Sequence, residues 1–345
     1  MTPEREEIEV DGRTLSISNP AKIFFPVLGI TKRQLVDYYI AVGPGALNGC
    51  RDRPTIMKRF PNGIAEDHFF QKRVAAKRPD WIQTARVTFP SERTADFIAP
   101  ADLAHIIWMV NLGCIDLNPW AVRRTDVDRP DELRVDLDPT PGIPFGHVRD
   151  IALLVRDVLA EHGLVGFATT TGSRGMHIYA RIEPRWEFTT VRRAALAFSR
   201  EVERRDARAT TAWWKEERTG VFLDYNMNAR DRTLSSPYSV RPNEEARVAC
   251  PLEWDEVPDV EPSELTLRTV PARFAERGDP MATIDGHTGS LDTLLELAER
   301  DEAGGLGDAP WPPHFPKARG EPSRVAPSRA RKPREDGRVT RKKKR

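Results

Sequence analysis

The chain has 345 residues, 30% of them charged and 39% hydrophobic, and a formal net charge of +1. That length allows one large domain or two moderate ones with a real core. Its three cysteines, Cys50, Cys114 and Cys250, form no C-x-x-C pair, which argues against a disulfide framework or a structural zinc site. No segment approaches the roughly 18 apolar residues of a membrane span, so we expect a cytoplasmic protein without a membrane partner.

The small net charge conceals two regions of opposite sign. Residues 317–345 contain thirteen Lys or Arg and three Asp or Glu, a net charge of +10, which leaves −9 for residues 1–316. A segment so rich in Arg, Lys, Pro and Ser cannot bury a core, and we expect residues 312–345 to be a disordered basic tail. Two roles are open for this tail: attraction to phosphates without sequence preference, or solubility and targeting.

The N-terminal stretch carries clear turn and cap signals. Asp11-Gly12 predicts a hairpin over residues 7–18, and Thr31 predicts the N-cap of a helix over residues 32–42. Lys22 and Lys32 flank the short connection between these elements. We expect this pair to present two ammonium groups to one phosphate, although isolated lysines are usually only solvated.

Basic and aromatic side chains alternate with turn residues over residues 54–72. Residues 56–60 and 68–72 are predicted strands joined by a turn. Basic groups beside aromatic rings suit stacking on bases along a phosphate backbone. Because Phe69 and Phe70 should point to opposite faces of a strand, we expect at most one in the core and the other free to stack. The alternative is that both pack against neighbouring elements.

The run Glu132–Pro139 places two carboxylates on one face of a predicted strand. Asp136 and Asp138 alternate with Val135 and Leu137, so the acids lie about 7 Å apart on one face. Like charges at that spacing repel unless a cation lies between them, and oxygen ligands suit Mg²⁺ or Mn²⁺. The alternative is a pair of exposed acids on a half-buried strand.

A glycine-rich turn separates two predicted strands at residues 166–180. Gly172 and Gly175 allow close backbone approach and would leave N–H groups of the turn free to bind phosphate oxygens. Taken alone, the segment is an ordinary hairpin, but beside two paired acids it favours an anion site. The turn and the outgoing strand supply a hydroxyl, a guanidinium and an imidazole: Ser173, Arg174 and His177.

Later segments add helices and a third acid. Helices are predicted over residues 100–112, 145–162 and 189–209, the last with its arginines mostly on a solvated face. An apolar strand at residues 220–226 leads to Asp224, which is either a third metal ligand or the acid of an Asx-turn. Arg241 follows within reach of the same rim.

Acids from separate segments, a glycine-rich turn and late basic groups together indicate phosphoryl or nucleotidyl transfer. Two divalent ions would activate an attacking hydroxyl and stabilise the leaving pyrophosphate, while basic groups neutralise a triphosphate. No Walker A motif is present. The candidate residues are Asp136, Asp138 and Asp224 for catalysis and the ions, and Ser173, Arg174, His177 and Arg241 for the triphosphate.

Five motifs occur in order along the chain: R-V-D-L-D-P (134–139), T-G-S-R-G-M-H (171–177), V-F-L-D-Y-N (221–226), S-P-Y-S-V-R (236–241) and P-L-E-W-D-E (251–256). In this order they closely resemble the polymerase domain of bacterial ligase D, in the archaeo-eukaryotic primase superfamily, over about residues 8–300. The resemblance implies a DNA-dependent DNA or RNA polymerase, or a primase-polymerase, acting in non-homologous end joining. Its expected ligands are Mn²⁺ or Mg²⁺, NTPs or dNTPs, and gapped or broken DNA with a 5′-phosphate.

The resemblance also implies roles for single residues. It makes Asp136, Asp138 and Asp224 the metal ligands and Ser173, Arg174, His177 and Arg241 the triphosphate contacts. It further assigns Lys58 to the incoming nucleotide, Lys22 and Lys32 to a downstream 5′-phosphate, and Phe69 or Phe70 to the template.

Two departures from the family pattern stand out. Asn118 replaces the histidine of L-H-P-W, which puts one contact near the nucleotide in doubt, and Arg174 stands where lysine is also usual. No ligase or phosphoesterase domain follows, so we expect a stand-alone, nucleoid-associated protein. A DNA ligase and an end-binding protein would then act in trans.

The expected fold is mixed α/β (α+β) and primase-polymerase-like, with central mixed or antiparallel sheets flanked by helices, and two lobes forming one groove. The catalytic domain would cover residues 1–311, divided into a DNA-end-binding part (about 1–120), a metal and nucleotide part (about 121–260) and a helical part (about 261–311). Two alternatives remain open: a two-metal nuclease, and a catalytically silent DNA-end-binding module.

Overall fold

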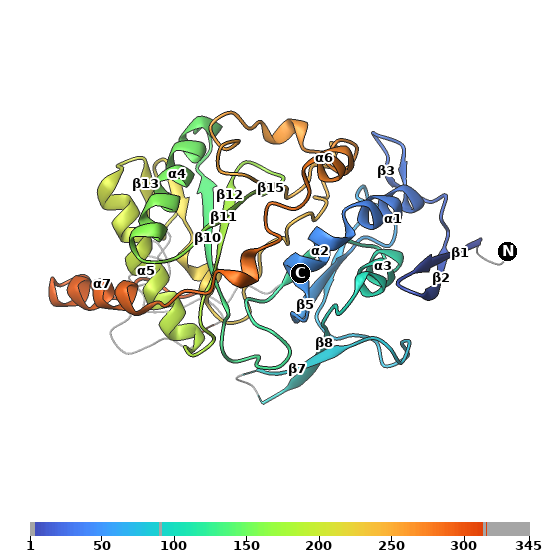
Figure 1. Ribbon diagram of the computed structural model, residues 1–345, viewed down its shortest axis with the longest axis horizontal. Helices are drawn as coiled ribbons and strands as arrows, with labels where there is room; N and C mark the ends of the chain where they lie inside the picture. Colours follow the sequence, from blue (N-terminus) through green and yellow to red (C-terminus); the bar gives the residue numbers. More distant parts are fainter. Residues whose placement is uncertain (1–3, 90–91, 313–314, 316–345) are drawn as a thin grey trace, which may run out of the picture.

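The computed structural model describes residues 4–89, 92–312 and 315, and within them the chain forms two main β-sheets, each flanked by helices (Figure 1). This arrangement confirms the expected mixed α/β class. The tail expected at residues 312–345 lies, apart from residues 312 and 315, outside the described part. No helix of that described part is long and apolar enough to span a membrane.

The N-terminal lobe is built on a five-stranded sheet. Its order is β6-β5-β8-β7, and β9 also pairs with β5. A separate hairpin precedes it at Asp11-Gly12, where both residues have positive φ, as its tight turn requires. The strands of this lobe are β1 (Arg5–Val10), β2 (Arg13–Ser18), β3 (Ile23–Phe25), β4 (Ile30–Thr31), β5 (Thr55–Arg59), β6 (Phe69–Gln71), β7 (Thr84–Thr88), β8 (Thr94–Ile98) and β9 (Cys114–Pro119).

Three helices belong to this lobe. The first begins at Thr31, whose hydroxyl accepts the N–H of Gln34 while the Gln34 side chain accepts the N–H of Thr31, a capping box. Asp102 is the N-cap of the third helix, and its carboxylate accepts the N–H of His105. The helices are α1 (Lys32–Ala41), α2 (Gly43–Cys50) and α3 (Leu103–Asn111).

The C-terminal lobe is built on a six-stranded sheet with β10 near its centre. The order is β13-β14-β10-β12-β11-β15, and every pair except β13–β14 is antiparallel. Helices α4 and α5 pack on this sheet, and α7 packs on α5 (Figure 1). The strands are β10 (Glu132–Pro139), β11 (Phe167–Thr170), β12 (Met176–Arg181), β13 (Ala209–Thr210), β14 (Val221–Leu223) and β15 (Pro251–Leu252). The helices are α4 (Phe145–Glu161), α5 (Phe188–Arg205), α6 (Val270–Arg277) and α7 (Asp292–Ala303), with short 3₁₀ turns η1 (Tyr225–Asn228), η2 (Pro262–Glu264) and η3 (Ile284–Gly286).

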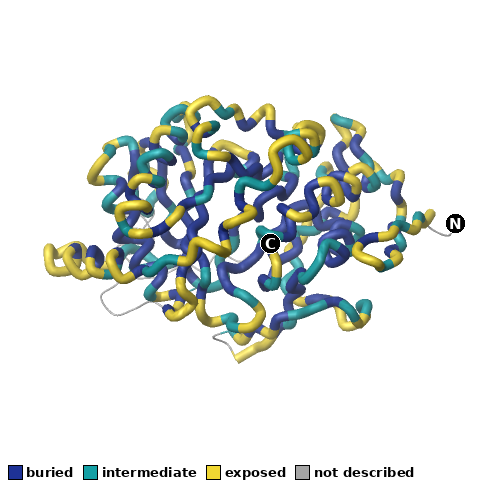
Figure 2. The backbone as a smooth tube through the Cα atoms, in the orientation of Figure 1, coloured by how far each residue is buried: buried dark blue, intermediate teal, exposed yellow. Residues whose placement is uncertain are grey.

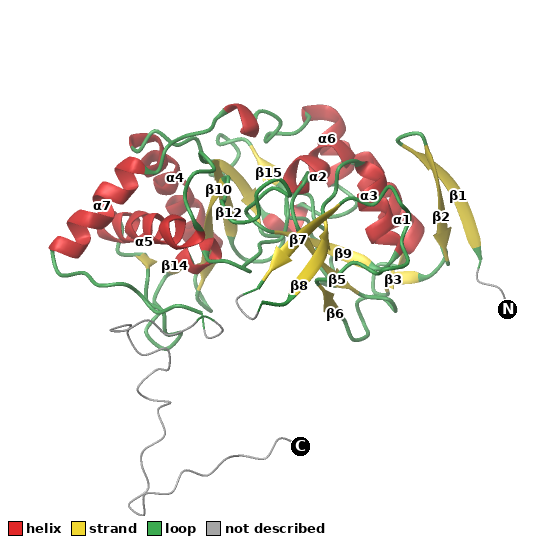
Figure 3. Ribbon diagram, turned by 90° about the horizontal axis from the view of Figure 1, so that it is seen from below, coloured by secondary structure: helices red, strands yellow, loops and turns green. Residues whose placement is uncertain are grey.

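One main hydrophobic core runs through both lobes. Buried side chains of the first lobe, such as Phe25 and Ile106, belong to the same cluster as Val135 and Ile178 of the second. The buried segments form a continuous interior in Figure 2, whereas the β1–β2 hairpin and α7 lie at opposite ends of the molecule in Figure 3. The two sheets are therefore held in a common structure that fixes the residues between them.

Candidate active site

The acidic strand has the alternation that the sequence predicts. Val135 and Leu137 are buried, 5% and 0% exposed, on the face of β10 on which α4 and α5 pack. Asp136 lies on the opposite face. Arg134 shares that face and donates to the carbonyl of Pro119 in β9, at 2.9 Å. The face of β10 that carries the acids is therefore the one directed toward the N-terminal lobe.

A row of polar side chains crosses three neighbouring strands at this point. Asp136 lies opposite His177 of β12, with 3.6 Å between His177 Nε2 and Asp136 Oδ1. On its other side, the N–H of Asp224 donates to the carbonyl of Asp136 at 3.0 Å. Opposite residues of an antiparallel pair share a face, so His177, Asp136 and Asp224 lie side by side. Asp138 follows two residues along the same face.

The three carboxyl groups influence one another electrostatically. Burial raises the pKa of Asp136 well above its ordinary value, and the charges of Asp224 and Asp138 raise it further. Burial also raises the pKa of Asp224, with Asp138 adding to the shift. Arg232 Nη2 lies 4.0 Å from Asp224 Oδ2. The positive charge of Arg232 lowers the pKa of both Asp136 and Asp224 and so opposes the two shifts. Both pKa values are raised mainly because burial disfavours the charged carboxylates.

Asp224 is the acid of an Asx-turn, one of the two roles that the sequence left open. Its Oδ1 accepts the N–H of Asn226 at 3.0 Å, the bond of an Asx-turn that starts η1. Its role as a metal ligand stays a prediction. As the side chains lie, no three His, Cys, Asp or Glu residues within the described ranges converge to hold a metal ion.

The glycine-rich turn packs directly against the acidic strand, which explains its two glycines. A Cβ at Gly175 would lie 2.1 Å from the carbonyl oxygen of Leu137. Gly172 has φ +63°, and a Cβ there would lie 2.4 Å from Cγ of Arg241. Only glycine permits these approaches, which bring Arg241 and the turn to one place.

One expectation about this turn needs correction. The sequence suggested that its N–H groups are free to bind phosphate, but those of Ser173 and Gly175 donate to Oγ1 of Thr171, at 3.1 and 3.2 Å. The threonine hydroxyl satisfies them because the tight turn brings it within reach. Ser173 and Arg174 are exposed at the tip, so their side chains rather than those two amides face solvent.

His177 is buried and its ring is oriented by a tyrosine. Tyr179 Oη lies 3.3 Å from His177 Nδ1 and donates its single proton to the carbonyl of Ser235 at 3.1 Å. Because Nδ1 contacts Tyr179, Nε2 is the ring nitrogen directed at Asp136. Burial, with Arg241 and Arg134 nearby, lowers the pKa of His177 to about 3, so the imidazole is neutral.

A buried carboxylate that the sequence analysis missed holds Arg241 in position. Asp116 of β9 is 2% exposed, and its Oδ2 lies 3.0 Å from Arg241 Nη1. Its Oδ1 accepts the hydroxyl of Ser235 at 2.5 Å. Lys58 lies opposite Asp116 in the β5–β9 register. Burial lowers the pKa of Lys58, the charge of Asp116 raises it, and the charge of Arg241 lowers it. The sequence did contain a signal for this buried acid, because Asp116 is the one charged residue in the otherwise apolar stretch 114–117.

The aromatic pair of β6 agrees with the expectation that at most one ring enters the core, and it contradicts the alternative that both are packed. Phe69 and Phe70 are both exposed, 46% and 60%, so neither enters the core. The reason is that β6 is an edge strand of the sheet, with β5 as its partner on one side. Arg59 lies over the ring of Phe69 at 5.1 Å, and Lys58 Nζ lies 5.8 Å from the centre of Phe70.

The lysine pair differs from the expectation that both ammonium groups are presented together. Lys22 is partly exposed and donates to Asn62 at 2.8 Å. Lys32 is 5% exposed, and its ammonium is already bonded to oxygen atoms of Ser18 and Asn111 at 2.5–3.2 Å. Burial, then Lys22 and Arg59, lower its pKa to about 8. Lys32 lies beneath the surface because the β2–α3 contact surrounds it.

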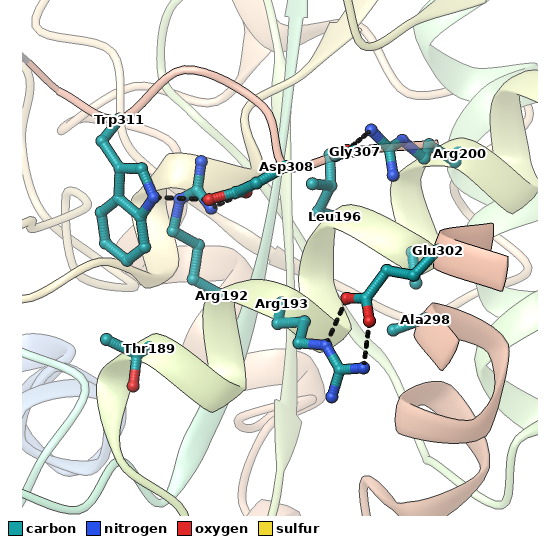
Figure 4. Close-up of a pocket in the computed structure, with 11 residues that line it drawn as sticks. Thr189, Arg192, Arg193, Leu196, Arg200, Ala298, Glu302, Gly307, Asp308 and Trp311 are labelled. Atoms are coloured by element: carbon teal, nitrogen blue, oxygen red, sulfur yellow. Dashed lines mark hydrogen bonds and ion pairs between the residues drawn. The ribbon is translucent and has the colours of Figure 1, made fainter. Parts of the chain in front are cut away.

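The buried side chain of Arg192 links the end of the described chain to the acid site. Arg192 of α5 is 1% exposed and is an exception among the mostly solvated arginines expected there. It donates to Asp308 at 2.8 Å and stacks on Trp311 at 3.9 Å (Figure 4). It also donates to Asn226 at 2.6 Å, the residue whose N–H bonds Asp224. The segment after α7 is thereby tied to the turn that carries the third acid.

Comparisons with known proteins agree on one family. Residues 31–281 match the model of the LigD primase-polymerase domain. The multifunctional non-homologous end joining protein LigD of Mycolicibacterium smegmatis is 30% identical, over 87% of this chain and 40% of its own. The LigD of Pseudomonas aeruginosa is 29% identical, over 78% of this chain and 33% of its own. The polymerase domain of Mycobacterium tuberculosis ligase D, solved in complex with DNA, is similar in structure, with a TM-score of 0.74 and 28% identity over 79% of this chain and 98% of that one.

The fold is that of a ligase D polymerase domain. The chain belongs to the LigD primase-polymerase family. It spans about 40% of the length of the mycobacterial relatives.

Proposed function

We propose that this protein is a DNA-directed nucleotidyltransferase that adds NTPs or dNTPs at gaps or breaks in DNA during non-homologous end joining. The observation that carries this proposal is the row His177–Asp136–Asp224 beside a turn that holds Arg241. Its relatives are non-homologous end joining proteins, and the similar solved domain was in complex with DNA. DNA and nucleotides are therefore the partners we propose.

Two divalent ions, Mg²⁺ or Mn²⁺, fit the chemistry of the acid site. Its ligands would be the carboxylates of Asp136, Asp138 and Asp224, which offer only oxygen atoms. The raised pKa of Asp136 supports this, since a cation would offset the burial and the repulsion that raise it. Such ions lower the pKa of a bound hydroxyl and stabilise a leaving pyrophosphate. Exposed Asp138 has the freedom to turn toward its neighbours.

The basic groups would bind the triphosphate and neutralise it as charge builds on the leaving group. Arg241 is held in place by Asp116, and a positioned guanidinium loses little freedom on binding a phosphate. Lys58 lies on the opposite strand from Asp116 and would reach the same nucleotide. The remaining proposed contacts are Ser173, Arg174 and His177 for the triphosphate, Phe69 or Phe70 for the template, and Lys22 for a 5′-phosphate. Lys32 is left out because its ammonium is already bonded to Ser18 and Asn111.

Primer extension on a gapped duplex with Mn²⁺ tests the proposal. The Asp136→Asn variant should lose activity by about 10³-fold or more, because removing even a single group that stabilises developing charge costs about 10²–10³. Asp292→Asn is the matched control, since Asp292 is exposed and pairs with Arg185 at the start of α7. Equal extension by Asp136→Asn and the parent would refute the proposal.

The same reactions separate the two alternatives. A two-metal nuclease would shorten the DNA in the absence of nucleotides and would depend on Asp136. An end-binding module without catalysis would bind the duplex and extend nothing, and Asp224→Asn would leave its binding unchanged.

A further inference from the structure

The segment that follows α7 packs along α5 beside a cavity. Residues 304–312, which we call the α7 extension, pass from Arg200 of α5, whose Nη2 donates to the carbonyl of Gly307 at 2.7 Å, toward Arg192. The cavity has a volume of about 200 Å³ and is bordered by α5, α7 and the extension (Figure 4). Its charged groups pair with one another, as Arg193 and Glu302 do at 2.7 Å. This pairing makes the region a joint between elements.

Arg192 connects the α7 extension to the acid site. Its Nη1 donates to Asp308 Oδ1 at 2.8 Å, and its Nη2 donates to the carbonyls of Ala309 and Pro310, at 2.8 and 3.3 Å. Its Nε donates to Oδ1 of Asn226 at 2.6 Å. Because a guanidinium is planar and rigid, one buried group holds the extension and η1 at a fixed separation.

Asn226 carries this connection on to the third acid. Its side chain is fully buried, and its Nδ2 donates to the carbonyl of Pro310 at 3.1 Å. Its backbone N–H donates to Asp224 Oδ1 at 3.0 Å, so the orientation of that carboxylate depends on where Asn226 lies. The other oxygen of Asp224, Oδ2, is 4.0 Å from Arg232. That oxygen is the one left for an ion.

Trp311 covers the connection from outside. Its ring centre lies 3.9 Å from Cζ of Arg192, and its Nε1 donates to Asp308 Oδ2 at 2.8 Å (Figure 4). The ring of Tyr225, next to Asp224 in the chain, lies 5.2 Å from the same carbon. The side chain of Asp308 is 47% exposed, so water competes for its ion pair with Arg192. The stacked indole limits that competition.

We propose that the α7 extension, acting through Arg192 and Asn226, positions the Asp224 carboxylate for a divalent ion and thereby sets the affinity of the acid site for that ion. This inference rests on the proposed function, because it assumes that Asp224 is an ion ligand. Asp308 and Trp311 are positioning residues in this scheme. A ligand that is held in place before the ion arrives binds it more tightly, because less freedom is lost on binding.

Titration of the full chain with Mn²⁺, without DNA or nucleotide, tests the inference by electron paramagnetic resonance of the free ion. Asp224→Asn should weaken Mn²⁺ binding by about tenfold or more, because a direct ligand loses its charge. Trp311→Ala and Asp308→Ala should weaken it by about three- to tenfold, somewhat less than the loss typical of a group that bonds a ligand directly. Trp311→Phe, which keeps a ring over Arg192, should recover most of the affinity.

Primer extension at varied Mn²⁺ separates positioning from a general loss of structure. In Trp311→Ala the Mn²⁺ concentration for half-maximal rate should rise by the same factor as the dissociation constant. The rate at saturating Mn²⁺ should stay within about twofold of the parent, because the ion restores the ligand geometry once it is bound. A variant that was merely less folded would instead lose rate at every Mn²⁺ concentration.

Glu302→Gln is the matched control, because Glu302 lines the same cavity but pairs with Arg193. It should leave Mn²⁺ affinity unchanged. Parental Mn²⁺ affinity in Trp311→Ala and Asp308→Ala, or in Asp224→Asn, would overturn the inference. An equal loss in Glu302→Gln would also overturn it, since the extension would then only stabilise the packing of α5 on α7. Mn²⁺ binding needs no catalysis, so the expected affinities in a protein that extends no primer would refute the proposed function alone.

Discussion

The proposed functional side chains of the two sheets differ in where they lie: between paired strands in one sheet and on an edge strand in the other. In the six-stranded sheet, functional groups lie in the interior of the sheet, where Asp136 is flanked by strands on both sides. In the five-stranded sheet, Phe69 and Phe70 lie on an edge strand and are open to solvent. The first arrangement holds the side chains between paired strands, whereas the second offers a surface that a large partner can contact.

This contrast matches the chemistry proposed for each lobe. A reaction centre must hold its groups in place before the substrate arrives, because reorganisation would cost free energy at the transition state. Stacking on a base needs only an accessible ring and tolerates variation in the partner. Changes in the six-stranded sheet should therefore affect folding and activity together, and changes at the β6 edge should affect DNA binding alone.

The largest effect is expected at Gly175. In Gly175→Ala the new Cβ would lie 2.1 Å from the backbone oxygen of Leu137, so the turn must move away from β10. We expect a loss of about 1–3 kcal/mol of unfolding free energy and a matching loss of ATP binding. Chemical denaturation and calorimetry measure the two effects.

Gly286→Ala is the control for this variant, since no atom lies within 4 Å of a Cβ built there. It should melt like the parent. A Gly175→Ala protein with unchanged stability and ATP affinity would show that the turn does not depend on contact with β10.

A smaller effect, confined to DNA binding, is expected at the β6 edge. Phe70→Ala should weaken binding of a gapped duplex by about 1–3 kcal/mol if Phe70 is the stacking ring, and Phe69→Ala reports on its neighbour. Because both rings are exposed, the unfolding free energy should stay within about 0.5 kcal/mol of the parent. Fluorescence anisotropy measures the binding. Val165→Ala, at another exposed apolar residue, is the control, and equal affinity of all four proteins would exclude stacking on this edge.

A third effect, confined to alkaline pH, concerns the pH dependence of stability at Lys32. Its pKa is about 8 in the folded protein and about 10.5 when unfolded, so between these values the unfolded chain binds more protons. The unfolding free energy of the parent should therefore rise with pH across this window relative to Lys32→Met, and the two curves should run parallel below about pH 7. Urea denaturation at pH 7, 8, 9 and 10 tests this. Parallel curves over the whole range would mean that Lys32 is not desolvated.

Local signals in the sequence accounted for much of the fold. The Asp11-Gly12 turn, the Thr31 cap and the alternation around Asp136 are each set by interactions within a few residues, and all three are confirmed. Elements without such signals, such as α2 and the β7–β8 pair, are found only in the structure, because their stability comes from contacts with distant segments.

The sequence by itself determined which residues could form the acid row and the glycine-rich turn, because side-chain alternation and glycine conformation are local properties. Tertiary structure alone decided that Asp116 holds Arg241, that Lys32 lies beneath the surface and that Arg192 ties residue 308 to Asn226. Each of these depends on segments that are separated in the sequence and meet in space, such as Lys32 with Asn111 and Arg192 with Asp308. Burial and pairing of a charge arise only where the folded chain excludes water from both partners.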